Sequence, residues 1–496
     1  MKETKHPQWA LQHRKPGTEL RLINGKYYLY QYKTVYDKDK KRPRKITGKL
    51  IGRITQKEGL IPSGKRKLEE SLKGIITSKP VCKEYGVSSL LLQQFSRYIS
   101  SLQKAFPEQW KAILQIAYCR FLYRCPIKNI PFRLAQSYLP ELIQAKPFNE
   151  KTASVLLKTI GGMHQEKLVY MKSFIRKEEH ILMDATNIFS HSSLITLARK
   201  GYNNQMHFDP QFNLLYLYSA KTAMPVYYRL LPGNIREVKA FKNCILEAGL
   251  KDAIVVADKG FFSSKNIELL LQEKLRFILP LKRDNALIDY SDLEDNTFKQ
   301  DDRYFEHEKR IIWFQEYTWN HLHVNIYLDE SLRINEEKDY LRRVQTHPEN
   351  YTLQEYHQIR NTFGTIVLLS NLRRNAKEIY QIYKSRMAIE LLFDGMKNVL
   401  EADHTYMQDE QTLHGWMFIN HITLQWYQHL YIELKNRDLL KKYSVNDLIQ
   451  MLSDLKMIKI NDSWHLNEIT NYAKRLFEKF EIPIETLYVS PFRVRG

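Results

Sequence analysis

The segment Ala253-Ile254-Val255-Val256-Ala257 constrains the fold more than any other part of the sequence. Five apolar residues in a row, without polar alternation, are typical of a strand that is buried on both faces. Such strands lie in the middle of parallel sheets whose two faces are covered by helices. We therefore expect an open α/β sheet with residues 253–257 at its centre.

The neighbouring segments predict the order of elements around this strand. Three earlier segments have strand patterns and predict an antiparallel meander, at residues 181–188, 211–220 and 225–231. Residues 236–247 have a helical pattern. Ser263 is a suitable N-cap for a helix that runs to Gln272, and residues 275–281 predict a fifth strand. Three antiparallel strands, helix, strand, helix, strand is the order of an α/β ribonuclease-H-like core, which is the fold class that we expect.

Two acidic residues interrupt or follow these strands. Asp184 lies in the middle of the apolar first strand, where an unpaired buried charge would be costly. Asp258 follows the central strand directly, and in open α/β sheets ligands bind beyond the carboxyl ends of the strands. Taken alone, Asp258 is better explained as the first residue of a turn.

A third carboxylate, Glu390, lies on a predicted helix at residues 383–397. At about 100° per residue, four polar residues fall within roughly 60° of one another: Tyr383, Arg386, Glu390 and Lys397. Apolar residues fall on the opposite side: Ile389, Leu392, Met396 and Val399. Taken alone, this helix is better explained as a surface helix. The two upstream aspartates change the balance in favour of a functional site.

Asp184, Asp258 and Glu390 together are suitable ligands for divalent metal ions. Phosphodiester cleavage requires an activated nucleophilic oxygen and a stabilised leaving oxygen, and two ions about 3.5–4 Å apart can supply both. Mg²⁺ prefers oxygen ligands, and the cysteines and histidines show no competing cluster. We therefore predict that these three residues are catalytic and hold two Mg²⁺ ions, for which Mn²⁺ can substitute.

The charge of the chain favours a polyanionic partner. The formal net charge is +21, and residues 1–80 hold 21 Lys and Arg residues against 7 Asp and Glu residues. Nucleic acid is the first candidate for such a basic segment, and an anionic membrane is the second. A membrane-binding helix would be amphipathic, whereas this segment has strand patterns, so the charge favours DNA.

The basic segment is predicted to fold as a β-ribbon. Residues 20–23 and 26–35 predict a hairpin through the turn Asn24-Gly25, and residues 46–54 predict a third strand. A basic ribbon with aromatic faces can enter a groove of DNA or follow its phosphates. The basic residues of the ribbon tip are therefore predicted to bind DNA, chiefly Lys41, Arg42, Arg44 and Lys45. A solvated turn on a small sheet is the alternative.

Changes of pattern divide the chain into six segments. They are a basic β-ribbon with a linker at 1–80, a helical domain at 81–178, the first part of the core at 179–283, an inserted mostly-β subdomain at 284–362, the second part of the core with the catalytic helix at 363–402, and a C-terminal helical region at 403–496. The linker is expected to begin at residue 59. The four cysteines have no metal-binding spacing, which favours a reducing compartment.

The N-terminus lacks an apolar run typical of a signal peptide, and no segment approaches the ~18 apolar residues that span a bilayer. We therefore expect a cytoplasmic, nucleoid-associated protein without a membrane partner.

The four polar residues of the predicted helix also carry a resemblance to a known family. Tyr383, Arg386, Glu390 and Lys397 match the signature Tyr-x2-Arg-x3-Glu-x6-Lys (YREK) with all spacings kept. The chain resembles the DDE transposases of bacterial insertion sequences that carry this signature, in the insertion-sequence-four-like superfamily. Residues 230–235 and 257–261 and the β region inserted before Glu390 are similar to that family as well.

This resemblance implies metal-dependent cutting at the ends of a mobile element, followed by transfer of the freed 3′-hydroxyl to target DNA. It implies that Tyr383, Arg386 and Lys397 contact the DNA end near the scissile phosphate. The partners would be double-stranded DNA, as terminal inverted repeats and target, and a second copy of the chain in a homodimeric synaptic complex. Two alternatives stay open: a catalytically inactive DNA-binding repressor, and a ribonuclease-H-like nuclease or resolvase that only hydrolyses.

Some members of the superfamily stack an extruded base on an aromatic ring. By that resemblance, Trp313, Trp319 and Phe363 are candidates for such a contact. For each of them, a place in the hydrophobic core is the simpler explanation.

Overall fold

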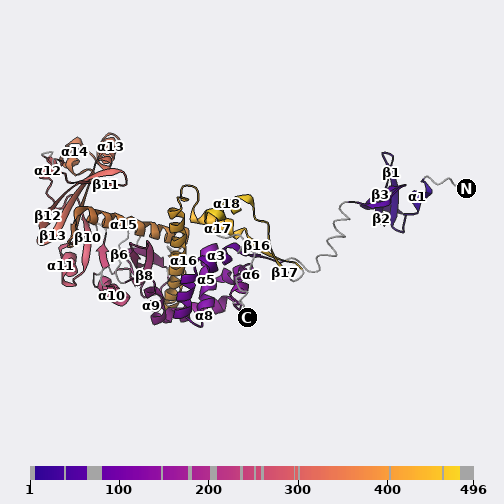
Figure 1. Ribbon diagram of the computed structural model, residues 1–496, viewed down its shortest axis with the longest axis horizontal. Coiled ribbons are helices and arrows are strands. Elements are labelled where there is room, and N and C mark those ends of the chain that lie inside the picture. Colours follow the sequence, from indigo (N-terminus) through magenta and orange to yellow (C-terminus); the bar gives the residue numbers. More distant parts are fainter. Residues whose placement is uncertain are drawn as a thin grey trace. The chain divides into compact units, whose positions relative to one another are not determined.

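The computed structural model describes residues 6–37, 41–63, 81–146, 149–176, 181–190, 192–201, 209–234, 238–250, 253–257, 262–294, 297–299, 302–401, 404–460 and 463–480. The chain forms two compact units. The first consists of Met1–Cys82 with Met457–Asn467, and the second of Lys83–Lys456 with Glu468–Gly496. Each unit has its own secondary structure (Figure 1).

The first unit contains an antiparallel sheet in the strand order β1-β2-β3-β4. Its elements are α1 (Gln8–Leu11), β1 (Thr18–Ile23), β2 (Lys26–Asp37), β3 (Arg42–Thr55) and β4 (Gly59–Pro62). The predicted hairpin is confirmed, because Ile23 pairs with Lys26 across the turn. The turn residues Asn24 and Gly25 have φ angles of 48° and 74°, as a two-residue turn with two left-handed positions requires.

The expected linker begins later than predicted. Residues 59–62 form β4, which pairs with β3, and residues 64–80 lie outside the described part of the chain. Leu60 packs against the small hydrophobic core of this unit. The sequence pattern missed this strand because it is only four residues long.

The outer half of the β2–β3 hairpin extends beyond the other strands. β1 pairs with β2 only as far as Gln31, and β4 pairs with β3 only from Gly52. Among the described residues, the strand segments 32–37 and 42–47 therefore pair only with each other. We call these segments, together with Lys41, the arm. The core of the unit lies at the other end of the sheet and consists of Ala10, Leu20, Leu29, Ile51 and Ile54.

The second unit contains a helical segment near its start. Its helices are α3 (Gly86–Gln94), α4 (Ser96–Ala105), α5 (Trp110–Tyr123), α6 (Ile130–Ala135), α7 (Leu139–Leu142), α8 (Glu150–Gly162) and α9 (His164–Lys172). Helix α16 (Glu410–Asn436) packs against α5 and α8. Trp416, Phe418 and Trp426 of α16 are buried, so the apolar residues of this segment belong to the core.

Helices α8 and α16 approach each other closely at two glycines. A Cβ atom on Gly415 would lie 1.9 Å from the carbonyl oxygen of Leu157, and one on Gly161 would lie 1.7 Å from that of Gln411. Both neighbours are backbone atoms, so they cannot move aside without a shift of the helix.

Gly415→Ala should therefore destabilise the second unit, by about 1–3 kcal/mol, the usual cost of overpacking a core. The matched control is Gly162→Ala in α8, because a Cβ atom there has no heavy atom within 4 Å. Thermal unfolding of the two variants checks this expectation. Equal midpoints for Gly415→Ala and the unsubstituted chain would contradict it.

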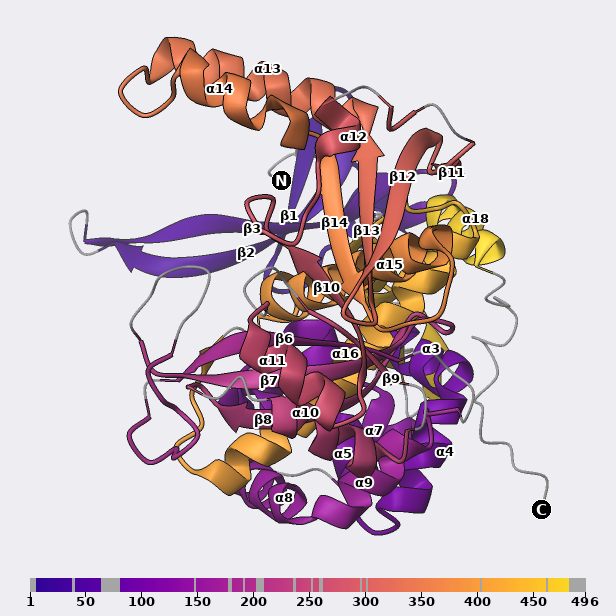
Figure 2. The same ribbon diagram turned by 90° about the vertical axis from the view of Figure 1, so that its left-hand side faces the viewer.

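A large mixed sheet forms the centre of the second unit (Figure 2). Nine strands follow the order β11-β12-β13-β14-β10-β9-β6-β7-β8, and β15 pairs with β6 off this path. The strands are β6 (Ile181–Ser190), β7 (Gln211–Ser219), β8 (Met224–Pro232), β9 (Ala253–Val256), β10 (Arg276–Leu281), β11 (Tyr304–His307), β12 (Arg310–Trp319), β13 (Leu322–Asp329), β14 (Thr365–Ser370) and β15 (His404–Thr405). The central position of β9 is confirmed, because it is buried and pairs in parallel with both β6 and β10.

Helices cover this sheet. α10 (Val238–Ala248) and α11 (Ser264–Gln272) contact each other and pack on β8 and β10, respectively. The predicted cap of α11 is confirmed, because Ser263 Oγ accepts a hydrogen bond from the backbone N–H of Asn266 at 3.2 Å. α15 (Ala376–Asp394) packs against β6, and α16 packs against β8.

The β region inserted before Glu390 does not form a sheet of its own. β13 pairs with β14, and β14 pairs with β10, so β11, β12 and β13 extend the central sheet (Figure 2). In this arrangement, β13 pairs with an edge of β14 whose backbone groups would otherwise be unpaired. Three further helices belong to the inserted segment: α12 (Ser291–Glu294), α13 (Glu330–Thr346) and α14 (Leu353–Ile359).

The C-terminal region contains strands as well as the expected helices. Along the chain, α17 (Val445–Ser453) precedes and α18 (Asn471–Lys479) follows the hairpin of β16 (Lys456–Ile460) and β17 (Ser463–Leu466). This hairpin joins β5 (Val81–Glu84) in a small sheet of order β17-β16-β5. Among the described residues, no helix is both long enough and apolar enough to cross a membrane.

Candidate active site

Asp184 lies at the point where β6 loses its central partner strand. On one edge, residues 181–183 of β6 pair with β9 and residues 189–190 pair with β15. Asp184 follows the last of the residues paired with β9, and its side chain is 14% exposed. One oxygen of its carboxylate, Oδ1, accepts a hydrogen bond from the backbone N–H of Ala185 at 2.9 Å. A mostly buried carboxylate thus stands in the middle of the central sheet.

Helix α15 carries the other predicted residues and is fixed by its apolar face. Asn375 caps its start by accepting a hydrogen bond from the backbone N–H of Glu378. Ile389 and Leu392 are buried, as the helical pattern predicted. Arg386 and Glu390 lie off this buried face, with side chains 17% and 55% exposed.

The guanidinium of Arg386 joins two of the three predicted carboxylates. Its Nε lies 3.3 Å from Asp184 Oδ2, and its Nη1 lies 3.3 Å from Glu390 Oε1. Arg386 and Glu390 are one helical turn apart, whereas Asp184 comes from a strand far earlier in the chain. The fold therefore brings Asp184 and Glu390 to two nitrogen atoms of the same guanidinium group.

Lys397 lies on a π-helical segment and not on the α-helix that the sequence predicts. α15 ends at Asp394, and residues Gly395–Val399 form a π-helical segment with a hydrogen bond from Leu400 N to Gly395 O. A π-helical turn contains more residues than an α-helical turn, so the 100° spacing does not extend to Lys397. The expected single stripe of four residues therefore holds only for Tyr383, Arg386 and Glu390. Single π-helical turns occur frequently at functional sites.

Asp258 lies outside the described residues. The described strand β9 ends at Val256, and Val255 pairs with Met183, the residue before Asp184. Asp258 follows Val255 by three positions in the sequence. Its predicted role therefore stays a prediction.

Lys384 is a further charged residue near this site that the sequence reasoning missed. Burial lowers the pKa of its ammonium group, and the carboxylate of Glu390 acts in the opposite direction. The Nζ of Lys384 lies 5.3 Å from the centroid of the Tyr380 ring. A helical projection places Lys384 about 100° from Tyr383, outside the polar stripe, so the helical pattern did not indicate it.

The predicted DNA-binding residues of the arm are all exposed: Lys41, Arg42, Arg44 and Lys45. Arg44 pairs with Val35 and Lys45 pairs with Thr34 across the arm. Because side chains alternate along a strand, Arg44 and Lys45 belong to opposite faces. Lys45 Nζ lies 4.4 Å from the centroid of the Tyr32 ring, so one face combines a cation with an aromatic ring. Lys38 and Lys40 of the tip lie outside the described residues.

The three aromatic candidates for base stacking differ in exposure. Phe363 is buried against Tyr340 and Tyr356, so its ring belongs to a local core. Trp313 and Trp319 of β12 are half-buried, and Trp313 packs against Tyr304 on the neighbouring strand. A core position thus explains Phe363.

Comparison with known proteins gives matches to transposases. Residues 175–426 match a family model described as a transposase DDE domain. Among solved structures, the chain is similar to the cryo-electron-microscopy structure of a piggyBac transposase synaptic complex with hairpin DNA, at 13% sequence identity and a TM-score of 0.33. That match covers 73% of this chain and 69% of the other. No curated protein matches the chain.

The family match spans β6 to β14, α15 and most of α16, and so includes the residues joined by Arg386. The matched residues make up just over half of the 496-residue chain. The protein therefore belongs to the transposase DDE domain family.

Proposed function

We propose that this protein is a DNA transposase that binds the ends of an insertion sequence, cleaves DNA there and joins the 3′-hydroxyl ends to target DNA. The observation that carries the proposal is the pair of contacts that Arg386 makes with Asp184 and Glu390, both at 3.3 Å. Two carboxylates from distant parts of the chain share one cation, within the region that matches the family.

The chemistry of these side chains suits divalent metal ions. Carboxylate oxygens are hard ligands of the type that Mg²⁺ prefers, and Mn²⁺ accepts the same ligands. Asp184 and Glu390, with Asp258 as the third ligand, would hold two ions, which supply charge stabilisation for the attacking and leaving oxygens of a phosphodiester. Arg386 offsets the charge of Asp184 and Glu390 and orients both carboxylates.

We further propose that the centre of the sheet is a ribonuclease-H-like core with the YREK signature. Support comes from the strand order β8-β7-β6-β9-β10, with β6, β7 and β8 antiparallel and β9 and β10 parallel to β6 and to each other. Along the chain, these elements follow the order expected from the sequence: three antiparallel strands, helix, strand, helix, strand. The signature would assign contacts with the DNA end to Tyr383, Arg386 and Lys397, near the scissile phosphate.

A strand-transfer assay tests the proposed function. The full chain is incubated with labelled duplex ends and Mg²⁺, and the products are separated by size. Cleavage with joining to target DNA supports a transposase. Cleavage without joining would indicate a nuclease or resolvase, and binding without cleavage would indicate a repressor. The terminal inverted repeats of the element provide the duplex ends.

DNA is the proposed partner of the arm, and a homodimer on two DNA ends is the proposed active assembly. The proposed location is with the nucleoid in the cytoplasm. The basic residues of the arm are exposed on both of its faces, as contact with phosphates requires.

Neutralising the arm should weaken DNA binding and reduce its salt dependence. Each phosphate contact contributes a slope of about −0.9 to log K against log salt, so Arg44→Gln with Lys45→Gln should reduce the slope by up to about 2. Binding constants of the full chain across a salt series measure this.

The matched control is Lys26→Gln with Lys57→Gln, which removes two exposed positive charges at the other end of β2 and β3. This control should leave the slope nearly unchanged. Equal slopes for the arm variant and the unsubstituted chain would show that the arm does not contact DNA.

A further inference from the structure

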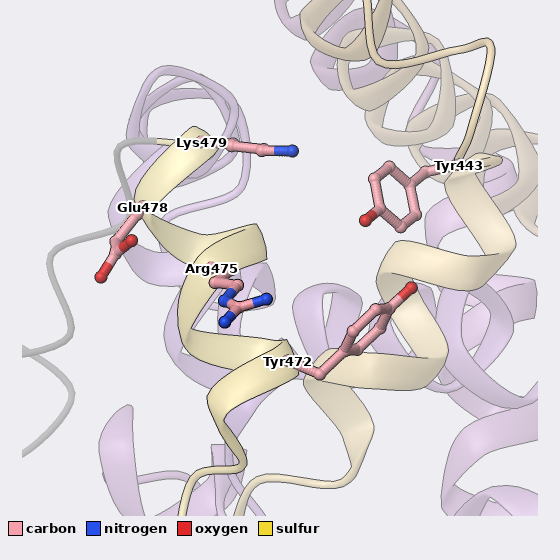
Figure 3. Close-up of a pocket in the computed structure, with 5 residues that line it drawn as sticks. All are labelled: Tyr443, Tyr472, Arg475, Glu478 and Lys479. Atoms are coloured by element: carbon pink, nitrogen blue, oxygen red, sulfur yellow. The ribbon is translucent and has the colours of Figure 1, made fainter.

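A pocket of about 460 Å³ lies between helix α18 and the loop that precedes α17 (Figure 3). Both elements belong to the second unit. Five residues line the pocket: Tyr443, Tyr472, Arg475, Glu478 and Lys479. Two aromatic rings and two cations therefore border one space outside the candidate active site.

The sequence of α18 explains why these side chains gather there. Tyr472, Arg475 and Lys479 are spaced by three and four residues, so they occupy one face of the helix. Ala473 and Phe477 are buried on the other side of the helix and fix it against the protein, and Leu476 is buried between the two faces. The polar face of α18 is thus held toward the pocket by the packing of its apolar face.

The side chains point into the pocket in a consistent way. Figure 3 shows Arg475 and Lys479 extending from α18 toward Tyr443, with Tyr472 closing one side of the space. Glu478 also borders the pocket, and Figure 3 shows its carboxylate on the side of the helix that faces away from Tyr443. Tyr472 is 58% exposed, so its ring is accessible to a ligand.

The electrostatics of the pocket favour an anion. Within the described part of the chain, Arg475 and Lys479 form no ion pair with an acidic side chain. The nearby carboxylate of Asp447 is already engaged, because it accepts hydrogen bonds from Ser444 N and Ser444 Oγ at 2.8 and 2.7 Å. Two cations and two phenol rings therefore border the pocket, beside the single carboxylate of Glu478.

We propose that this pocket binds one nucleotide of single-stranded DNA, with its phosphate between Arg475 and Lys479 and its base against the ring of Tyr472. The inference rests on the proposed function, which makes DNA the anionic partner. Proteins that bind single-stranded nucleic acids combine cations that contact the backbone with aromatic rings on which bases stack. A paired duplex keeps its bases stacked inside and would use the cations but not the exposed ring. Cleavage of a DNA strand provides ends that can separate from their complement.

Photo-crosslinking to the full chain tests the location of this site. The probe is a short oligothymidylate with one 5-iododeoxyuridine, and the cross-linked peptide is identified by mass spectrometry. The expected cross-link lies in a peptide that contains Tyr472 or Tyr443. Cross-links confined to other parts of the chain would overturn the proposal.

Affinity for the same oligothymidylate tests the role of each side chain. All variants are compared in a full chain that also carries Arg44→Gln and Lys45→Gln, so that binding to the arm does not mask the pocket. Tyr472→Ala should weaken binding by about 5-fold to 100-fold, the range expected for loss of one stacked base. Tyr472→Phe should bind like the background chain, because it keeps the ring. Arg475→Gln and Lys479→Gln should each weaken binding and reduce its salt dependence.

The matched control is Lys474→Gln, which removes an exposed positive charge from the same helix at a position that does not line the pocket. It should not weaken binding. Equal affinities for Tyr472→Ala and Tyr472→Phe would overturn base stacking, and equal competition by a duplex of the same length would overturn single-strand binding.

Cleavage of duplex ends by the unsubstituted chain is measured in parallel. If only the proposal for the pocket is wrong, the chain will still cleave duplex ends in the presence of Mg²⁺. If the proposed function is wrong, this cleavage will not be observed.

Discussion

Replacing Glu390 with glutamine should lower DNA cleavage by roughly two to three orders of magnitude while DNA binding persists. The substitution keeps the size of the side chain but removes a charged ligand, and metal ions supply several kcal/mol of charge stabilisation in such sites. Each ~1.4 kcal/mol corresponds to about a factor of ten in rate. The fold should survive because Glu390 is 55% exposed and lies off the buried face of α15.

Asp184→Asn and Asp258→Asn should have the same effect, since the three carboxylates act as one set of ligands. The matched control is Glu378→Gln, which removes a carboxylate from the first turn of the same helix, where Glu378 pairs with Arg374. A gel-shift assay and a cleavage assay with Mg²⁺ or Mn²⁺ are run on each variant. Near-normal cleavage by Glu390→Gln or Asp258→Asn would show that the assignment of the site is wrong.

Local chemistry explains which parts of the fold could be predicted from the sequence. The turn Asn24-Gly25, the cap at Ser263 and the apolar strand β9 each depend on a few adjacent residues, and the structure confirms all three. The buried face of α15 depends only on helical spacing, and Ile389 and Leu392 are buried as predicted. For these elements, a signal within about ten residues determined the local structure.

Features that depend on contacts between distant segments could not be predicted in this way. The inserted strands lie within the segment 284–362, for which the sequence predicts β structure, but their pairing with β14 depends on an edge contributed by a later part of the chain. The π-helical segment at Gly395–Val399 interrupts a sequence pattern that continues as an α-helix. At Gly395, a Cβ atom would lie 3.0 Å from the ring of Tyr427 on α16, so packing against another helix limits this position.

The candidate site shows the same division. The sequence indicated Asp184 and Glu390, together with Asp258, because of their residue types and the expected order of elements. It placed Arg386 beside Glu390 but gave no sign that Arg386 also contacts Asp184. That contact requires the actual distance between α15 and β6, which no helical or strand pattern contains.

Replacing Arg386 with alanine should show two separate effects, one on the charge balance of the site and one on its contact with DNA. The guanidinium lies 3.3 Å from both Asp184 and Glu390, so its loss leaves two carboxylates without their shared cation. In the absence of divalent ions, the variant should unfold at a lower temperature than the unsubstituted chain. Added Mg²⁺ should raise its unfolding temperature more than that of the unsubstituted chain, because ligands stabilise the state that binds them and the site is one unit more negative.

Cleavage by Arg386→Ala should nevertheless fall by about 10-fold to 100-fold, the usual cost of losing a group that orients metal ligands. Engagement of the DNA end should weaken with it, since the proposed role of Arg386 includes a contact with that end. Arg386→Lys keeps the charge but not the planar fork that reaches two carboxylates, so it should restore stability without Mg²⁺ better than it restores cleavage.

Arg374→Ala is the matched control, because it removes an arginine that pairs with Glu378 four residues later near the start of the same helix. Its response to Mg²⁺ should equal that of the unsubstituted chain. If Mg²⁺ raised the unfolding temperature of Arg386→Ala and of the unsubstituted chain equally, and cleavage were unchanged, Arg386 would be a surface residue of α15 without a role in the site. A larger response with impaired cleavage would instead identify the guanidinium as the group that balances the carboxylates before metal ions and DNA bind.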